Sequence, residues 1–511
     1  MRRLLNFLLS RVVLISLLIL LQLVMVLVLV VWVSSYAFRY YLLLLILSSI
    51  LVIYLIQKRG NPTYSQAWII VLLVFPLFGG VIYLLFGNKR VPKALMRQAH
   101  QFDDEETPVL TQQESILAAL KEKDATVAKQ FHYVSRYPGY PVYQHTRVEY
   151  FPSGEEMFAV LLDKLKSAKR YIFLEFFIIW EGVMWEQILE ILLAKVKEGV
   201  DVRLIYDDAG CISTLPDGYD ERLRRLGIHC YIFNKVRARL MVQMNNRDHR
   251  KICVIDGQTG FLGGMNVGDE YINVIDRFGH WKDAAVMLEG EAVDSLTVMF
   301  LQFYSFLIGK REIYEDYLQD PFHFANIHHE GYVQPYSDTP TDNEDVGETM
   351  HLNMINQAKH YIYIMTPYLV PSYDMVKALT IAAKDGVDVR IMVPHIPDKW
   401  YVHEVTRSHY QDLTQAGIRI FEYLPGFLHS KIFVCDNQLA ICGSTNMDYR
   451  SYYLNYECGV MFYDDPAILK ICDDFLKTQT ECLEITLASC KKTGIVRRVA
   501  RAVLGLLSPL L

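Results

Sequence analysis

Two short segments of this 511-residue chain carry the same set of reactive residues. Each reads His-x-Lys-x-x-x-x-Asp and is followed, seventeen positions after its histidine, by an asparagine. The two sets are His249, Lys251, Asp256 and Asn266, and His429, Lys431, Asp436 and Asn446. Three fixed positions match by chance only about once in 8,000 tries, so two matches with the same downstream residue are not a coincidence.

These residue types suit chemistry at a phosphate group. Alternate residues of a strand share a face, so each motif histidine points the same way as its lysine. Two lobes that meet at these strands would gather two imidazoles, two ammonium groups and two asparagine amides around one small volume. The ammonium and amide groups can bind phosphate oxygens. One imidazole can attack phosphorus, while the other protonates the leaving alkoxide and later takes a proton from the incoming alcohol.

The acidic residues have less certain places in this scheme. Asp283 or Glu457 could hold the second nitrogen of its lobe's partner histidine and fix the tautomer. Asp256 and Asp436 lie at the far ends of the motif strands, where hydrogen bonding at a turn or strand end is favoured over a chemical role. Neither helical ligand spacing nor a carboxylate cluster accompanies the histidines, and the lysines would repel a cation. We therefore expect no metal and no other cofactor.

The surroundings of the motifs are repeated as well. Gly199-Val-Asp-Val-Arg203 recurs as Gly386-Val-Asp-Val-Arg390, each after a stretch of helical period and before an apolar strand. Matching segments are 168–172 and 358–362, 252–255 and 432–435, and 283–287 and 457–461. This order predicts an α/β fold of two duplicated lobes related by a pseudo-twofold axis, over residues 130–330 and 331–490.

Much of the chain's hydrophobicity, 52% overall, lies in its first ninety residues. The apolar segments 12–33, 40–56 and 68–87 predict transmembrane helices, since about 20 helical residues cross a hydrocarbon core of about 30 Å. A cleaved signal peptide is the alternative, but the first apolar stretch is too long and no small-residue cleavage site follows it. We expect a membrane anchor over 1–90 and a polar linker over 91–129.

The composition also bears on location and partners. Basic residues are balanced across the predicted spans and do not fix their orientation. The nine cysteines are odd in number and contain no Cys-x-x-Cys pair, which argues against a disulfide framework and favours a cytoplasmic position for the lobes. Cys253 and Cys435 are expected to be buried strand thiols. The net charge of −6 argues against a nucleic-acid partner.

Two local clusters of basic residues stand against that average. The first consists of Lys235, Arg237, Arg239, Arg247 and Arg250. The second lies in the C-terminal segment 491–511, where lysines and arginines alternate with isoleucines and valines. This segment predicts a basic amphipathic helix on an anionic membrane surface, with an ordinary C-terminal docking helix as the alternative.

The doubled motif resembles that of the phospholipase D superfamily, and the chain as a whole resembles the bacterial cardiolipin synthases. The supporting segments are 61–63, 85–87, 150–157, 173–182, 246–251, 366–369, 425–431 and 508–511. The resemblance implies that two phosphatidylglycerols give cardiolipin and glycerol through a phosphatidyl-histidine intermediate. It also implies an active-site set of His249, Lys251, Asp256, His429, Lys431 and Asp436, with His249 as nucleophile and His429 as acid.

The departures from the family pattern are small. The first lobe has Gly263-Gly-Met-Asn266 where the second has Gly443-Ser-Thr-Asn446, and its acidic residue is Asp283 rather than a glutamate. Segment 12–33 goes beyond the two-span anchor of the family. Other functions that use the same motif are a lipid hydrolase, a phosphatidylserine-forming transferase and a nuclease. A membrane scaffold with an inactive cleft is the non-enzymatic alternative.

Overall fold

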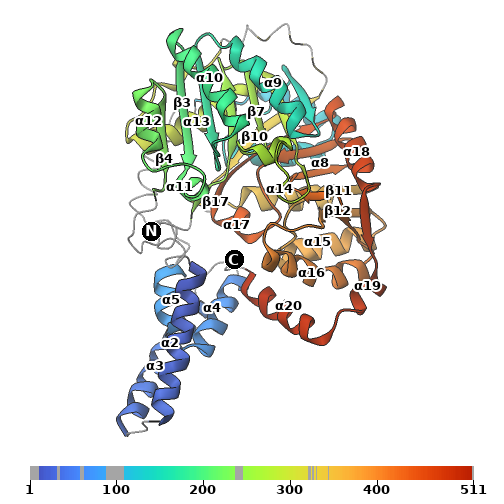
Figure 1. Cartoon of the computed structure of the whole chain (residues 1–511). Coiled ribbons are helices and arrows are strands. Elements are labelled where there is room, and N and C mark those ends of the chain that lie inside the picture. Colours follow the sequence, from blue (N-terminus) through green and yellow to red (C-terminus); the bar gives the residue numbers. More distant parts are fainter. Residues whose placement is uncertain are drawn as a thin grey trace. The chain divides into compact units, whose positions relative to one another are not determined.

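The computed structural model describes residues 11–31, 35–57, 62–76, 78–87, 109–235, 246–319, 324, 327, 329, 331–342 and 344–508. The chain divides into a helical unit, mainly residues 1–90, and a larger α/β unit of residues 91–237 and 246–505 (Figure 1). Each unit is described by itself.

The first lobe of the α/β unit is built on a seven-stranded sheet. Its strands, in spatial order, are β1 (Thr146–Phe151), β9 (Ala285–Gly290), β7 (Thr259–Gly263), β6 (Lys251–Ile255), β2 (Tyr171–Phe176), β3 (Asp201–Asp207) and β4 (His229–Phe233). The chief helices are α9 (Gly154–Ser167), α10 (Val183–Lys197), α12 (Tyr219–Arg225) and α13 (Val293–Ile308). Strands β2, β3 and β4 are parallel, and β6 runs antiparallel to β2.

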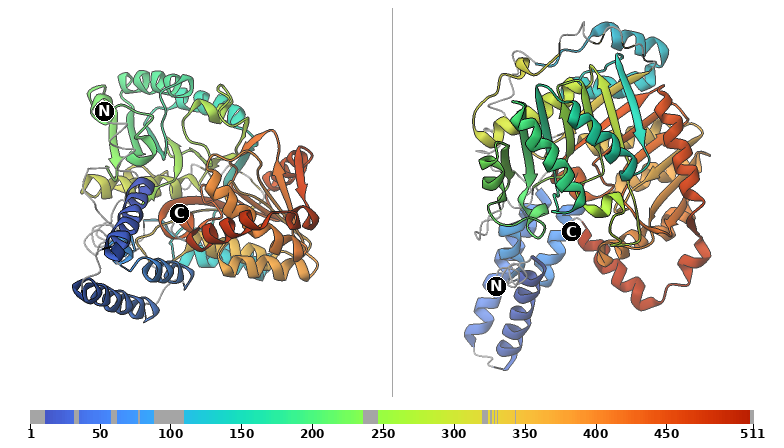
Figure 2. Two further views of the ribbon diagram at one scale, coloured as in Figure 1. Left: turned by 60° about the horizontal axis from the view of Figure 1, so that its bottom comes forward. Right: turned by 45° about the horizontal axis from the view of Figure 1, so that its top comes forward.

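The second lobe repeats this order and adds a final strand. Its strands are β10 (Tyr332–Asp338), β17 (Asn455–Tyr463), β16 (Leu439–Gly443), β15 (Ile432–Cys435), β11 (Tyr361–Met365), β12 (Asp388–Pro394), β13 (Arg419–Tyr423) and β18 (Cys482–Ile485). Its main helices are α14 (Val346–Gln357), α15 (Tyr373–Lys384), α16 (Trp400–Gln415) and α18 (Pro466–Gln479). The predicted α/β duplication is confirmed, and Figure 2 shows both sheets.

Both faces of the first sheet are covered, which explains why its strands are almost continuously apolar. Ile172 and Leu174 of β2 pack with α9 and α10 on one face. Phe173, between them in sequence, packs with α13 on the other face. The core on the α13 side continues into the second lobe, so the two lobes share one hydrophobic interior.

Part of the predicted linker belongs to the compact α/β unit. Helices α7 (Glu114–Lys123) and α8 (Ala125–Arg136) occupy this region, and the boundary expected between residues 129 and 130 falls inside α8. The side chain of Gln130 donates a hydrogen bond to the Met350 carbonyl at 3.1 Å. Gln334 likewise donates to the Phe131 carbonyl at 3.0 Å. These buried amide contacts attach α8 to the second lobe.

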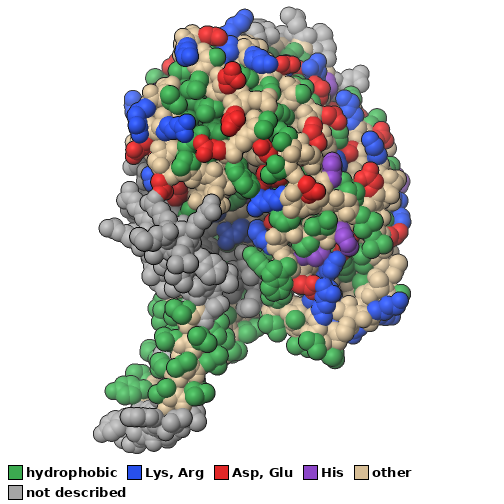
Figure 3. All heavy atoms as spheres, in the orientation of Figure 1, with side chains coloured by type: hydrophobic (Ala, Val, Ile, Leu, Met, Phe, Trp, Pro, Cys, Tyr) green, Lys and Arg blue, Asp and Glu red, His purple; other side chains and the backbone are tan. Residues whose placement is uncertain are grey.

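The helical unit contains α2 (Arg11–Val31), α3 (Ser35–Gln57), α4 (Pro62–Val74) and α5 (Phe78–Phe86). Within the described residues, one window is long and apolar enough to cross a bilayer, Tyr40–Gln57 of α3. Hydrophobic side chains dominate the visible surface of this unit (Figure 3). A surface of this kind is stable in lipid and unfavourable in water.

The predicted third span, 68–87, is wrong as a single helix. The helix is interrupted between α4 and α5 at Pro76. Proline has no backbone N–H to donate and disfavours helical geometry in the residue before it. A side chain at Gly79 would meet the Val71 carbonyl oxygen at 2.7 Å, so the two short helices approach closely at this glycine. The apolar composition suggested one span, whereas the proline divides it into two helices too short to cross a membrane alone.

Candidate active site

Each motif histidine is positioned by a strand of the opposite lobe. The short strand β5 (Arg247–Asp248) pairs in parallel with the start of β17, and the His249 amide donates to the Tyr456 carbonyl at 2.9 Å. In the other half, β14 (Gly426–Leu428) pairs in parallel with β8 (His280–Lys282), and the His429 amide donates to the Lys282 carbonyl at 2.7 Å. This exchange brings both motifs to the junction of the lobes.

The exchange sets each imidazole against a carboxylate of the other lobe. Nδ1 of His249 lies 2.9 Å from Oε2 and 3.0 Å from Oε1 of Glu457. Nδ1 of His429 lies 2.6 Å from Oδ2 of Asp283. A carboxylate on Nδ1 holds the ring in one orientation and leaves Nε2 for chemistry. Both acidic residues named from the sequence therefore hold a motif histidine, and each does so across the junction.

The two carboxylates differ in their other contacts. Glu457 accepts hydrogen bonds from the Ser444 hydroxyl at 2.5 Å and from the Asn455 amide at 3.1 Å. Asp283 accepts one from the Ala284 backbone amide at 2.8 Å. Where Ser444 stands in the second lobe, the first has Gly264, and a Cβ there would lie 2.2 Å from Oδ1 of Asp283. The position of the Asp283 carboxylate therefore leaves no room for a side chain at residue 264.

Burial opposes the ionisation of both carboxyl groups, but the net shifts of their pKa values are opposite. It raises the pKa of Glu457 to about 7, although Lys251 acts in the other direction. Burial also opposes the ionisation of Asp283, but His429 and Lys431 outweigh it and lower the pKa of that carboxyl. Asp283 is therefore the more fully charged of the two acids at neutral pH.

The motif lysines lie beside the histidines as predicted and are almost completely buried. The Nζ atoms of Lys251 and Lys431 donate to the backbone carbonyls of His249 and His429 respectively. Burial lowers the pKa of Lys251 to about 8 and that of Lys431 to about 7, despite the nearby carboxylates. The nearby carboxylates thus do not fully offset burial, and a bound anion would stabilise the charged form of both ammonium groups.

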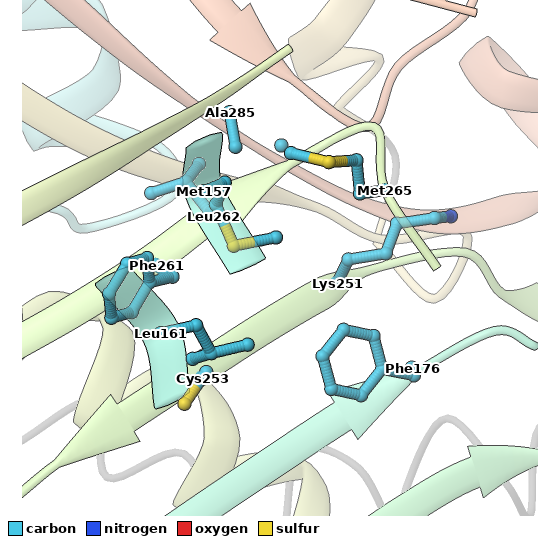
Figure 4. Close-up of a pocket in the computed structure, with 10 residues that line it drawn as sticks. Met157, Leu161, Phe176, Lys251, Cys253, Phe261, Leu262, Met265 and Ala285 are labelled. Carbon is cyan, nitrogen blue, oxygen red and sulfur yellow. The ribbon is translucent and has the colours of Figure 1, made fainter. Parts of the chain in front are cut away.

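A small apolar cavity beneath Lys251 contributes to this desolvation. It has a volume of about 20 Å³, and Phe176, Cys253 and Met265 are among its lining residues. Figure 4 shows the Lys251 stem extending from β6 over this lining, with its Nζ directed away from the apolar side chains. A space of this size holds at most about one water molecule and cannot admit an acyl chain.

The pKa values of both imidazoles are lowered, which favours their uncharged form at neutral pH. Burial lowers the pKa of His429 to about 4, and Lys431 adds to the effect. Burial also lowers the pKa of His249 well below 6.5, and both motif lysines lower it further. A neutral imidazole is a nucleophile, and a bound phosphodiester anion would favour protonation of its neighbour.

The two predicted phosphate-binding asparagines are unequal. Asn266 is engaged at both ends of its amide, since Oδ1 accepts from the Ile178 amide at 3.0 Å and Nδ2 donates to the Tyr271 hydroxyl at 2.7 Å. Asn446 is also buried, but its Oδ1 accepts no hydrogen bond within the part of the chain that the structure describes. Oδ1 is an acceptor and cannot bind a phosphate oxygen, so the group of Asn446 able to bind an anion is Nδ2, which donates to no residue that the structure describes.

The structure places Asp256 and Asp436 away from this cluster, at the far ends of β6 and β15. Asp256 accepts hydrogen bonds from the backbone amides of Lys169, Arg170 and Tyr171 at 2.7–2.9 Å. Asp436 accepts from the equivalent amides of residues 359–361 at 2.7–2.9 Å. Each aspartate ties the end of its motif strand to the start of the neighbouring strand.

Both aspartates have a left-handed backbone, with φ of 55° and 54°. Aspartate tolerates this conformation better than most residues, which adds a second local reason for its presence. This geometry explains the fixed spacing within the motif without a contact to the reacting atoms.

The sequence did not assign Phe177, Tyr271 or Trp281 to the surroundings of the histidines. The ring of Phe177 lies 5.2 Å from His249, and Trp281 lies 5.3 Å from His429. Tyr271 and Phe427 are each 5.7 Å from His429. No spacing rule marks these positions, because they come from separate loops and strands. They create the apolar surroundings that keep both imidazoles uncharged.

Lys399 is a further cation that the motif did not indicate. It contributes to the lowered pKa of His249 and lies over the Tyr368 ring at 5.1 Å. Two members of the basic cluster before the first motif, Arg247 and Arg250, are buried instead, whereas Lys235 is exposed. Arg250 forms buried ion pairs with Glu175 at 2.7 Å and Asp248 at 3.3 Å. Arg237 and Arg239 lie outside the described residues.

A duplicated α/β fold whose exchanged strands bring two His-Lys pairs to one anion-binding site defines the phospholipase D class. A family model described as "Cardiolipin synthase, PLD-like domain" matches residues 161–289 and 351–478, and one described as "Phospholipase_D-nuclease N-terminal" matches residues 46–88. The chain belongs to the cardiolipin synthase family of phospholipase D-like proteins.

Individual relatives agree with this assignment. "Cardiolipin synthase 2" of Bacillus anthracis is 35% identical over 89% of this chain and 88% of its own length. An "Uncharacterized protein" of Streptococcus mutans is 41% identical over 90% of this chain and 99% of its own. The crystal structure of phosphatidylserine synthase from Haemophilus influenzae aligns with a TM-score of 0.57 at 14% identity, covering 75% of this chain and 97% of that one. This last likeness establishes a shared fold.

Proposed function

We propose that this protein is a membrane-associated cardiolipin synthase, which transfers a phosphatidyl group from one phosphatidylglycerol to another and releases glycerol. The observation that carries the proposal is the pair of buried imidazoles, each held at Nδ1 by a carboxylate of the opposite lobe. Two equivalent bases beside two lysines suit a reaction with two similar half-steps at one phosphorus atom. The lipid substrate is proposed because relatives of this chain are named cardiolipin synthases.

In the first half-reaction, Nε2 of His249 attacks the phosphorus of one phosphatidylglycerol. The bond from phosphorus to the glycerol oxygen breaks, and His429 gives its proton to that oxygen, so that glycerol leaves. Asp283 stabilises the protonated form of His429 that this step requires, and the phosphodiester charge acts in the same direction. The product is a phosphatidyl-histidine at residue 249.

In the second half-reaction, His429 takes the proton from a glycerol hydroxyl of the second phosphatidylglycerol. The resulting oxygen attacks phosphorus, the phosphorus–nitrogen bond breaks, and His249 returns to its neutral state. One cardiolipin and one glycerol have then been formed from two phosphatidylglycerols. Neither step uses a cofactor, because His429 recovers from the incoming hydroxyl the proton that it gave to the leaving glycerol oxygen.

Lys251, Lys431 and Asn446 bind the non-bridging phosphate oxygens in this scheme, where negative charge is greatest in the transition state. Asn266 has a supporting part, since its amide is already bonded to Ile178 and Tyr271. Asp256 and Asp436 hold the motif strands in register and do not act on the substrate.

Two questions arise about location: whether the protein associates with a membrane, and how it is oriented there. An apolar helix, the matched N-terminal family segment and a lipid substrate support membrane association. We further propose that the anchor crosses the membrane more than once and that the lobes lie on the cytoplasmic side. All nine cysteines are free and seven are buried, which suits a reducing compartment. A cysteine at exposed position 129 should react with an impermeant maleimide only after cells are permeabilised, whereas labelling of intact cells would place the lobes outside.

Incubation of the purified protein with phosphatidylglycerol tests the reaction itself. The expected products are cardiolipin and glycerol in equal amounts. Phosphatidic acid without cardiolipin would instead identify a hydrolase, and phosphatidylserine formed only when serine is added would identify a serine transferase. Steady cleavage of single-stranded DNA would instead identify a nuclease. The absence of turnover with every one of these substrates would favour a membrane scaffold with an inactive cleft.

A further inference from the structure

The C-terminal helix α20 (Ile495–Leu507) turns its apolar side to solvent. The side chains of Ile495, Val496, Val499 and Val503 are 77%, 81%, 58% and 52% exposed. Their spacing places them on one face, because residues three and four apart are neighbours on a helix. A helix on the surface of a water-soluble protein has the reverse orientation, with its apolar face inward.

Two of the three arginines of α20 are held against the second lobe. Arg497 and Arg501 both bind Glu404 of α16, with Nε–Oε2 distances of 3.1 and 2.8 Å. Figure 1 shows α20 on the side of the second lobe where α16 lies. The hydrogen bond from Arg497 lowers the pKa of Glu404 to about 2, and Arg501 adds to the effect. Glu404 therefore stays charged at any physiological pH, and we call its contacts with the two arginines the latch. Because the arginines are bound inward, the valines point outward.

The remaining basic residues of this region are exposed and could bind an anionic surface. Lys491 and Lys492 are exposed directly before the helix, and Arg498 is exposed within it. None of the three takes part in an ion pair among the residues that the structure covers. Trp400, one turn before Glu404 on α16, is 69% exposed. An exposed tryptophan beside a basic apolar helix is typical of a membrane interface.

We propose that α20 is a membrane-docking helix, which lies in the interface of an anionic bilayer with its apolar side toward the acyl chains and is held in this orientation by Glu404. The proposal rests on the proposed function only in that the substrate is a membrane lipid. The occupant is a bilayer rather than a second protein chain, because exposed valines flanked by lysines complement acyl chains beneath phosphate headgroups.

The docking helix is also connected to the phosphate site by packing. Leu504, on the inward side of α20, packs against a cluster that includes Val370, Val405 and Tyr449. Tyr449 follows Asn446 by three residues. Binding of α20 to lipid would therefore hold the second lobe, and the loop that carries Asn446, at the surface from which the substrate comes.

A dye at position 499 tests the contact with lipid directly. The full-length protein, with Cys482 and Cys490 changed to Ser, carries Val499→Cys labelled with nitrobenzoxadiazole and is placed in nanodiscs of phosphatidylglycerol or phosphatidylcholine. Doxyl-labelled lipids should quench the dye, and more strongly in phosphatidylglycerol, while a dye at exposed position 477 of α18 reports the background. Equal access of aqueous iodide to both positions would overturn the proposal. So would protection of position 499 in detergent that rises with protein concentration, because that result identifies a second chain.

The latch has a matched control. Glu404→Gln should release α20 and reduce lipid quenching at position 499, whereas Glu484→Gln, which breaks the exposed pair of Glu484 with Arg419, should leave it unchanged. Equal quenching in both variants would remove Glu404 from the account.

An activity comparison separates docking from catalysis. Val499→Asp together with Val503→Asp should lower cardiolipin formation from vesicles by about tenfold or more, since two apolar side chains no longer enter the bilayer. Activity on monomeric dihexanoyl phosphatidylglycerol should remain within about twofold of wild type, because the site is untouched. Equal losses on both substrates would contradict a docking role. A wild-type protein inactive on both would refute the proposed function instead, and the quenching result would still decide the docking.

Discussion

The two halves of the active site share one skeleton and differ in the acid that completes each. At His249 the partner is Glu457, which Ser444 and Asn455 also engage. At His429 the partner is Asp283, at 2.6 Å and beside a glycine. The strand exchange follows a similar pattern on both sides and brings both histidines to the junction, whereas the acid differs and with it the support for a protonated ring.

This difference indicates a division of labour. Asp283 is the more fully ionised acid and therefore the better partner for a protonated imidazole, as the acid–base step requires. Burial raises the pKa of Glu457 to about 7, so it stabilises a positive charge on His249 less well. A ring that remains neutral suits a nucleophile. The contrast supports His249 as the nucleophile and His429 as the acid and base.

The strongest way to break this comparison is to neutralise each acid in turn. Asp283→Asn should lower kcat by about 10³-fold or more, because it removes the charge that supports protonated His429. Glu457→Gln should cost about 10- to 100-fold, since that carboxyl is partly protonated already. Steady-state kinetics of cardiolipin formation measure both. A larger loss for Glu457→Gln would reverse the assignment of the two histidines.

Gly264 and Ser444 occupy equivalent positions and offer a smaller test. Gly264→Ala should lower kcat by about 100-fold, because its Cβ would displace Asp283, and a shift of about 1 Å has such an effect. Ser444→Ala should cost only about tenfold through one lost hydrogen bond to Glu457. Circular dichroism of each variant controls for unfolding. Equal effects would mean that the two acids are supported in the same way.

The lysines predict a change of apparent affinity with pH. The pKa values of about 7 for Lys431 and about 8 for Lys251 mean that both lose their charge as the pH rises. An anion binds best to the protonated form, so KM for phosphatidylglycerol should rise by about tenfold between pH 7 and pH 9. KM measured across this interval, with kcat determined separately, gives the result. A constant KM would show that the lysines remain charged throughout.

The motif aspartates should have the smallest effect on turnover. Asp256→Asn and Asp436→Asn each retain one acceptor oxygen and should lower the free energy of unfolding by about 1–3 kcal/mol, with kcat changed by no more than about threefold. Denaturant unfolding and kinetics on the same samples separate the two effects. A loss of kcat with unchanged stability would assign these aspartates to the chemistry.

Much of this arrangement could be predicted from residue types and spacing. The doubled motif places His249 beside Lys251 and His429 beside Lys431, and the repeated flanking segments predict two similar lobes. The contact of His249 with Glu457 joins residues 208 positions apart and depends on the strand exchange between lobes, which local periodicity does not encode. The rings of Tyr271 and Trp281 beside His429 were missed for the same reason, since both come from the first lobe.

The remaining differences from expectation have local causes. Hydropathy alone could not reveal that Pro76 divides the third apolar segment, because the residues on both sides are equally apolar. Asn266 and Asn446 occupy matched positions, yet only the structure distinguishes the amide bonded to Ile178 and Tyr271 from the one with an unbonded oxygen among the described residues. Equivalence in sequence thus predicts position well and hydrogen bonding poorly.

The central claim is that His249 forms the covalent intermediate and His429 moves the proton. Its most direct test uses a phosphatidyl ester with a p-nitrophenyl leaving group, which departs without an acid, followed by rapid quenching and peptide mass spectrometry. The phosphatidyl adduct should map to His249, accumulate in His429→Ala, where the second step lacks its base, and be absent from His249→Ala. An adduct on His429, or turnover of His249→Ala at the wild-type rate, would contradict the account.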